Sequence, residues 1–209
     1  MTTAQQRAFE QHWQRWGLRH DDGPICFAEV FGRRAPVVME IGFGMGHSLV
    51  QMAEAAPQND FIGVEVHKPG VGRLLHDCAE RGLDNIRVYC HDAVEVVRDC
   101  IPRESLDGVQ IFFPDPWHKK RHHKRRLIQP PFLQKLASRL RHGGTLHLAT
   151  DWENYAQQMM EVSTACPDLR NAFGQGQYAP RPPDRPLTKF EGRGERLGHG
   201  VWDLVFERC

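Results

Sequence analysis

The sequence predicts an α/β domain with a mostly parallel sheet and helices on both of its faces. Apolar runs alternate with segments of helical periodicity from residue 35 onward, and most of these runs end beside an acidic residue. The chain has 209 residues, which suits one domain with a sizeable core. Hydrophobic residues make up 40% and charged residues 25%, and no apolar run has the length of a membrane span, so we expect a soluble globular protein.

The N-terminal region predicts a helix over Ala4–Leu18, ended by Gly17 and the Gly23–Pro24 pair, and then a linker over Asp21–Arg34. We therefore expect residues 1–34 to form an N-terminal helix and linker, and residues 35–209 to form the core of a single domain. The first residues lack the apolar core of a signal peptide, and the six cysteines show no C-x-x-C pair or zinc spacing. These features predict a cytoplasmic protein with reduced thiols, no metal and no membrane contact.

A buried strand is predicted over Val37–Ile41, followed by a glycine turn and a helix over Ser48–Ala56. The glycines at positions 42, 44 and 46 allow a tight turn and a close approach of the backbone to a ligand. Glu40 precedes the first glycine by two residues. A carboxylate there suits a ligand with hydroxyls or an amine better than one with a pyrophosphate.

Two more predicted strands end in acids. Phe61–Pro69 contains Glu65, about twenty residues past the glycine turn, where a ribose-binding carboxylate is expected. Ile86–Ala93 contains Asp92, which either accepts a hydrogen bond from a base amine or caps the following helix. The intervening segment, Val71–Arg81, predicts a helix that Gly82 ends.

The fourth predicted strand, Leu106–Phe113, leads into Asp115, which Pro114 and Pro116 hold on a stiff turn. The remaining pattern predicts a helix over Pro130–Arg141 capped by Gly143–Gly144, a strand over Thr145–Thr150 before Asp151, a helix over Trp152–Thr164, an ambiguous strand within Asp168–Gln177, a loop over Pro180–Gly198 and a closing strand over Val201–Glu207.

A basic segment follows Asp115 and contains Lys119, Lys120, Arg121, Lys124, Arg125 and Arg126, with His122 and His123 among them. These six cations belong to a total of 27 Lys and Arg, which leaves 21 against 26 acidic residues elsewhere. The rest of the chain is therefore mildly acidic, and the positive charge is concentrated as phosphate binding requires. A carboxylate, an aromatic residue and a polyanion-binding surface within sixteen residues indicate chemistry on a nucleic-acid base.

Four motifs occur in order: E-I-G-F-G-M-G from Glu40, F-F-P-D-P-W-H-K-K-R-H-H-K-R-R from Phe112, T-D-W-E-N-Y-A from Thr150 and T-K-F-E from Thr188. With them the chain resembles the bacterial tRNA (guanine-N7-)-methyltransferase (TrmB) family from the first helix to the closing strand. The resemblance implies a class I S-adenosylmethionine-dependent methyltransferase (Rossmann-like) fold, with seven strands of which the last is antiparallel. It also implies methylation of the variable-loop guanosine at position forty-six of tRNA.

The resemblance further implies roles for individual residues. The cofactor, S-adenosyl-L-methionine, and its product, S-adenosyl-L-homocysteine, would lie on the glycine turn and the acids Glu40, Glu65, Asp92 and Asp115. Asp115 also matches the residue assigned the catalytic role. Substrate-contacting positions match Lys119, Asp151, Thr188, Lys189, Phe190 and Glu191, and the RNA-contacting segment matches Arg121–Arg126. The expected tRNA-binding segments are thus 117–126 and 180–198. One departure from the family pattern is that members often carry a longer, basic N-terminal tail, whereas Met1 begins almost at the first predicted helix here.

Other functions remain open at this point. A nicotinamide-dependent oxidoreductase shares the glycine turn, although its fingerprint is G-x-G-x-x-G. A non-catalytic RNA-binding module explains the basic segment but not the acids at the strand ends, and a small-molecule methyltransferase explains the acids but not the basic segment. A different RNA methyltransferase explains both. The sequence gives no preference between a monomer and a homodimer.

Overall fold

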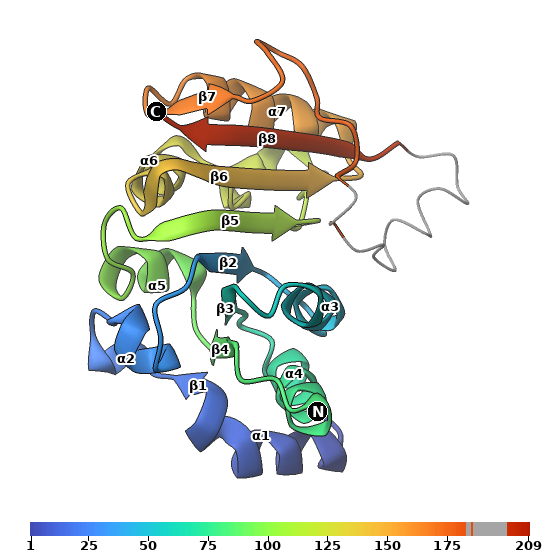
Figure 1. Cartoon of the computed structure of the whole chain (residues 1–209). Coiled ribbons are helices and arrows are strands. Elements are labelled where there is room, and N and C mark those ends of the chain that lie inside the picture. Colours follow the sequence, from blue (N-terminus) through green and yellow to red (C-terminus); the bar gives the residue numbers. More distant parts are fainter. Residues whose placement is uncertain (183–184, 186–199) are drawn as a thin grey trace.

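The computed structural model describes residues 1–182, 185 and 200–209, and its centre is one twisted sheet (Figure 1). The strands are hydrogen-bonded in the order β1-β4-β3-β2-β5-β6-β8-β7. Strands β1 to β6 pair in parallel, whereas β8 is antiparallel to both β6 and β7. The bounds are β1 Gly17–Leu18, β2 Val37–Ile41, β3 Asp60–Val64, β4 Ile86–Tyr89, β5 Leu106–Phe112, β6 Leu140–Thr150, β7 Leu169–Asn171 and β8 Trp202–Arg208.

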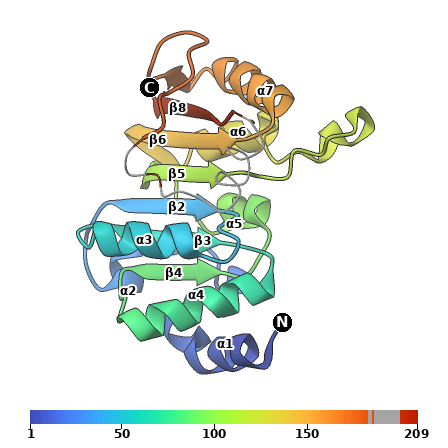
Figure 2. The ribbon, with the colours of Figure 1, turned by 90° about the vertical axis from the view of Figure 1, so that its right-hand side faces the viewer.

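Helices cover both faces of the sheet, as the alternating pattern predicts. One core lies between the sheet and the helices α1, α3 and α4, and the other between the sheet and α5, α6 and α7. Figure 2 shows α3 and α4 on the face turned toward the viewer. The bounds are α1 Thr3–Trp16, α2 Phe27–Phe31, α3 His47–Ala55, α4 Lys68–Arg81, α5 Ala93–Asp99, α6 Pro130–Ala137 and α7 Glu153–Thr164, with two 3₁₀ turns, η1 His20–Asp22 and η2 Lys120–Arg125.

The N-terminal region is more structured than the predicted helix and linker. Residues 17 and 18 form β1, an eighth strand beside the expected seven, because they pair in parallel with Val88 and Tyr89 of β4. The predicted linker contains η1 and α2, and Ile25, Phe27 and Phe31 pack against the core. Backbone pairing with a distant strand and apolar burial, neither visible locally in the sequence, order this region.

The helix predicted over Pro130–Arg141 is too long, and Gly143–Gly144 is not its cap. Helix α6 ends at Ala137, and β6 already begins at Leu140. The register of β6 against β5 jumps from Leu106↔Leu140 to Gly108↔Thr145, so the extra residues form a bulge. A Cβ at Gly144 would lie 2.9 Å from the Arg141 carbonyl oxygen, which explains a glycine inside this strand.

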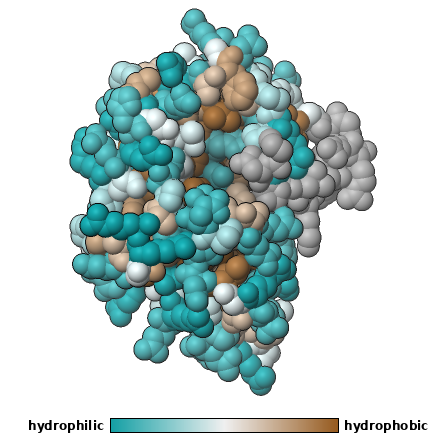
Figure 3. Space-filling view, in the orientation of Figure 1, coloured by the Kyte–Doolittle hydropathy of each residue, from teal (hydrophilic) through white to brown (hydrophobic). Residues whose placement is uncertain are grey.

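The visible face of the molecule in Figure 3 is largely hydrophilic, with small separate hydrophobic patches. Within the described part of the chain, no helix has both the length and the apolar character needed to cross a membrane.

Candidate active site

Acidic residues stand at or beside the carboxyl ends of five neighbouring parallel strands. In the order β4, β3, β2, β5 and β6 they are Asp92, Glu65, Glu40, Asp115 and Asp151. The arrowheads of β2, β5 and β6 in Figure 1 point to the same edge of the sheet. Because the five strands are parallel neighbours, their topology brings these side chains to one edge, where open α/β sheets bind ligands.

The glycine turn between β2 and α3 requires its glycines. Gly42, Gly44 and Gly46 have φ angles of 77°, 59° and 79°, in the left-handed region that side-chain-bearing residues rarely adopt. A fourth glycine, Gly70 in α4, was not singled out from the sequence. A Cβ at Gly70 would lie 1.9 Å from the Gly44 carbonyl oxygen, so the turn packs directly on the α4 backbone.

Glu65 fixes the turn from the end of β3. Its Oε2 accepts a hydrogen bond from the Gly44 N–H at 2.9 Å, and its Oε1 accepts one from the His67 N–H at 2.8 Å. Each carboxylate oxygen keeps further acceptor capacity, and the side chain is only half-buried. Glu65 therefore holds the glycine turn in place while it remains accessible to a ligand hydroxyl.

Glu40 lies deeper, with 2% of its surface exposed. Its Oε1 accepts a hydrogen bond from Ser48 Oγ at 2.7 Å, whereas its buried Oε2 has no hydrogen-bond partner among the described residues. Burial raises the pKa of Glu40 to about 7; the Ser48 hydrogen bond opposes this rise, and repulsion from Glu65 adds to it. A buried, partnerless carboxylate oxygen is costly unless a ligand donates to it, and Ser48 had no sequence signal.

Asp92 and Asp115 are exposed and each is anchored by its own backbone turn. Asp92 caps α5, since its Oδ1 accepts from the Val94 N–H at 2.8 Å and the Glu95 N–H at 3.3 Å. Asp115 Oδ1 accepts from the Trp117 N–H at 3.0 Å. The helix-cap alternative for Asp92 is thus observed, and the cap uses only its Oδ1 atom.

The backbone around Asp115 is strained on both sides. Phe113 and Trp117 have φ angles of 52° and 46°, in the left-handed region that bulky residues seldom occupy. The Phe113 N–H donates to the Ala149 carbonyl at 2.8 Å, which ties the start of this turn to β6. Strain of this kind is typical of residues held in place for function.

The basic segment forms η2 and projects from the body beyond β5 (yellow-green in Figure 2). Lys119, Lys120, Arg121, Lys124 and Arg125 are exposed, whereas His122 and His123 are partly buried. The Arg125 guanidinium lies over the Trp117 ring at 5.0 Å, and the His122 ring meets the same indole edge-on. The exposed cations thus stand on a folded turn directly after Asp115.

Arg126 differs from the other five cations because only 2% of its surface is exposed. Its Nε donates to the Pro116 carbonyl at 2.8 Å, while its terminal nitrogens donate to Gln158 Oε1 at 2.5 Å and Asn154 Oδ1 at 2.9 Å. It also stacks over the Tyr155 ring at 4.7 Å, and burial lowers its pKa. Arg126 therefore joins the turn that carries Asp115 to helix α7.

Asp151 is half-buried immediately after β6. The adjacent Trp152 packs edge-on against His118 at a ring-centroid separation of 4.3 Å, which brings the start of α7 to the start of the basic segment. The predicted substrate residues Thr188, Lys189, Phe190 and Glu191, and most of the predicted segment 180–198, lie outside the described residues.

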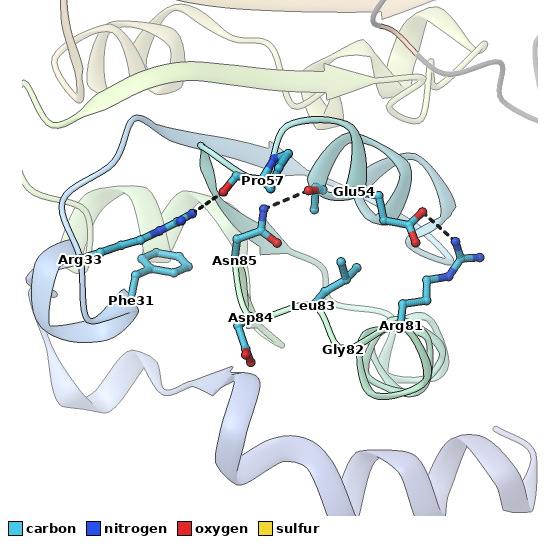
Figure 4. Close-up of a pocket in the computed structure, with 10 residues that line it drawn as sticks. Phe31, Arg33, Glu54, Pro57, Arg81, Gly82, Leu83, Asp84 and Asn85 are labelled. Atoms are coloured by element: carbon cyan, nitrogen blue, oxygen red, sulfur yellow. Dashed lines mark hydrogen bonds and ion pairs between the residues drawn. The ribbon is translucent and has the colours of Figure 1, made fainter.

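A pocket at the opposite, amino end of the strands is lined by Arg33, Arg81 and Asn85 among others (Figure 4). Its polar groups satisfy one another: Arg33 donates to the Pro57 carbonyl, Arg81 pairs with Glu54, and the Asn85 amide donates to the Ala53 carbonyl. This pocket offers no catalytic constellation comparable to that at the carboxyl edge.

The parallel sheet with its antiparallel β8, the glycine turn and the acids at the carboxyl edge define a class I S-adenosylmethionine-dependent methyltransferase fold. A crystal structure of the 16S rRNA methyltransferase KamB shares this fold, with a TM-score of 0.66 at 15% identity over 88% of this chain and 92% of that one.

Sequence comparison gives the particular family. Residues 34–204 match the family model described as "Putative methyltransferase". Proteins named tRNA (guanine-N(7)-)-methyltransferase from Pseudoalteromonas atlantica and Marinobacter nauticus are 59% and 60% identical over 208 residues, covering 100% of this chain and 87% of each relative. The chain belongs to the tRNA (guanine-N7-)-methyltransferase family.

Proposed function

We propose that this protein transfers a methyl group from S-adenosyl-L-methionine to N7 of guanosine in tRNA, at the variable-loop position named above. The observation that carries the proposal is the junction at the end of β5. Asp115 stands there between the row of cofactor-type acids and the exposed cations of η2. RNA whose phosphates are held by those cations would present a base to the cofactor edge at Asp115. Family membership supports the same reaction.

The buried oxygen of Glu40 supports the cofactor assignment. Glu40 Oε2 needs a donor, and the ammonium of a bound amino-acid moiety supplies one. We assign Glu65 to the ribose hydroxyls and Asp92 to the adenine amine, in the order of their strands. Gly42 and Gly44 leave space for the ligand beside the turn, since nothing lies within 4 Å of a Cβ built at either of them. A Cβ at Gly46 would lie 2.8 Å from Leu74 Cδ1, so this third glycine serves the packing of the turn against α4.

The reaction requires orientation and electrostatics more than acid–base chemistry. The bound cofactor supplies an activated sulfonium methyl, and guanine N7 has a free lone pair at neutral pH. The chain needs no metal and no general base for this step. Asp115 holds the guanine edge and thereby orients N7 in line with the methyl group. Its negative charge also stabilises the positive charge that moves from the sulfur to the base during transfer.

We assign the RNA contacts to the two segments 117–126 and 180–198. Guanine N7 faces the deep major groove of an A-form helix, so the target must lie in a loop or be displaced from its contacts. Lys119 and the exposed cations of η2 bind phosphates and fix the register of the RNA. We assign Asp151 and Thr188–Glu191 to the target nucleotide, and Arg126 to the position of the turn rather than to RNA.

A bacterial enzyme with this substrate acts in the cytoplasm, and we propose that it works there as a monomer or homodimer. The direct test incubates unmodified tRNA with the full chain and isotope-labelled S-adenosylmethionine, followed by nucleoside mass spectrometry. Labelled 7-methylguanosine at the variable loop is expected. Label on another nucleoside would support the cofactor assignment but refute the assignment of guanine N7 as the target. The protein would then be a different RNA methyltransferase. Absence of label together with retained S-adenosylhomocysteine binding would refute catalysis on tRNA by this chain alone.

A further inference from the structure

A cluster of metal-ligating side chains lies where the N-terminal region meets helix α5, outside the residues assigned to methyl transfer. His20 belongs to η1, His91 follows β4, and Glu95 lies in the first turn of α5. One ligand atom from each of the three lies within 4.8 Å of the others. No other group of three or more His, Cys, Asp or Glu side chains converges in this way within the described residues.

The two imidazoles lie face to face, so their in-plane lone pairs converge on one ion only after one ring rotates. Their rings stack with centroids 4.3 Å apart and planes 11° from parallel. His91 Nε2 lies 2.7 Å from Glu95 Oε2, and His20 Nε2 lies 2.9 Å from Asp99 Oδ2. A carboxylate that binds one ring nitrogen sets the tautomer and orientation of a ligand histidine, as Asp99 does for His20.

The separations suit a small ion after modest adjustment. Two ligand atoms at about 2.1 Å from a tetrahedral Zn²⁺ are roughly 3.4 Å apart. The His91–Glu95 pair is already closer than this, and the upper limit of 4.8 Å requires a side-chain movement of about 1.4 Å. All three side chains are partly exposed, so rotamer changes and metal entry are open to them.

The surrounding charge also favours a cation. Asp21 Oδ1 lies 3.7 Å from His20 Nδ1, and Asp99 adds a second carboxylate on the other side of that ring. Arg98 pairs with Asp99 and offsets part of this negative charge. Two imidazoles with one carboxylate are a donor set for Zn²⁺ and its neighbours in the first transition row, and not for Mg²⁺ or Ca²⁺.

We propose that His20, His91 and Glu95 bind a divalent transition metal of the Zn²⁺ class, with Asp99 orienting His20. Such an ion links η1 to the first turn of α5, because His20 comes from one and Glu95 from the other. It therefore fastens the N-terminal region to the Rossmann-like core. The site does not depend on the proposed function, since methyl transfer needs none of its ligands.

The test titrates untagged, chelator-treated full-length protein with Zn²⁺ by calorimetry and with Co²⁺ by visible absorption. The wild type is expected to bind one equivalent saturably, with the Co²⁺ spectrum of a four-coordinate site. His20→Gln and His91→Gln should each lose at least tenfold in affinity. His142→Gln is the matched control, because His142 is an exposed histidine on β6, and it should bind as the wild type does.

A second control variant and a folding check distinguish the proposed site from other metal binding and from misfolding. A double His122→Gln, His123→Gln variant should retain the one-equivalent site, which separates it from any binding by the basic segment. Circular dichroism checks folding, and Glu95→Gln, on an accessible helix turn, replaces any histidine variant that fails to fold. Absence of saturable binding by the wild type, or equal affinity in the ligand and control variants, would overturn the proposal and leave two ordinary histidine–carboxylate hydrogen bonds.

Discussion

Replacement of Glu40 by glutamine separates two effects of this buried carboxyl group, namely its effect on the free energy of unfolding and its effect on cofactor binding. In the folded protein without ligand, burial raises the pKa of Glu40 from 4.5 to about 7. Folding therefore favours the protonated form, and the group destabilises the fold increasingly as the pH rises from about 4.5 to about 7. The 2.5-unit rise corresponds to about 3 kcal/mol above pH 7.

Glu40→Gln removes this titration while it keeps the shape of the side chain and an acceptor for Ser48 Oγ. We expect the ligand-free variant to be more stable than the wild type at pH 8, by up to about 3 kcal/mol, and the difference to shrink below about pH 5. Denaturant unfolding at the two pH values measures it. Glu54→Gln, an exposed carboxylate on the same strand–helix unit, is the control that should show no comparable gain.

Cofactor binding should change in the opposite direction. A ligand ammonium requires ionised Glu40, and at 1.5 pH units below a pKa of about 7 roughly 3% of the group is ionised. Wild-type affinity for S-adenosylhomocysteine should therefore fall by roughly 30-fold from pH 8 to pH 5.5, about 2 kcal/mol. Glu40→Gln should bind weakly throughout and without this slope. If the variant binds as tightly as the wild type at pH 8, or keeps the same slope, Glu40 does not bind the ammonium.

Three further predictions concern the turn after β5 and the basic segment. Asp115→Ala should lower the single-turnover methylation rate on the order of 100-fold while the tRNA dissociation constant stays nearly unchanged; equal losses in both would refute its role in the transfer step. Arg126→Met should destabilise the fold by about 2–4 kcal/mol in denaturant unfolding because it strands buried acceptors, whereas Lys124→Met, on the exposed side of η2, should leave stability within about 0.5 kcal/mol; an unchanged Arg126 variant would contradict the burial argument. Lys120→Glu with Lys124→Glu should weaken all tRNAs alike and flatten the salt dependence of binding; loss confined to one tRNA would indicate base readout instead.

The sequence predicts the carboxyl edge well because parallel topology converts strand ends into neighbours. Glu65, Asp92 and Asp115 follow apolar runs, and alternation with helices is enough to place them on one edge. Their environments are less accessible to such reasoning. Glu40 and Glu65 look alike in the sequence, yet Glu40 is buried with a partnerless oxygen while Glu65 binds two backbone N–H groups.

Long-range contacts determine two features that local sequence patterns do not predict. Six cations of the basic segment are equivalent by composition, but Arg126 finds acceptors at Asn154 and Gln158, about thirty positions away in the chain. The same holds for the bulge at Gly143–Gly144, where pairing of β6 with β5 overrides the local helix-cap signal. In both cases the deciding partner belongs to a different element of the fold.

The contacts around Asp115 give a physical reason why the two halves of the site act together. The turn is fixed to β6 by the Phe113 N–H and to α7 by Arg126 through the Pro116 carbonyl. Asp115 thus stands between two anchors, with strained residues on either side, and the exposed cations extend from the second anchor. If RNA binds η2 as proposed, we expect α7 to resist the load on this segment before it reaches Asp115. The arrangement would then keep the carboxylate aligned with the proposed cofactor edge while the basic segment adapts to tRNA, and it gives a reason for a buried cation, Arg126, at the end of that segment.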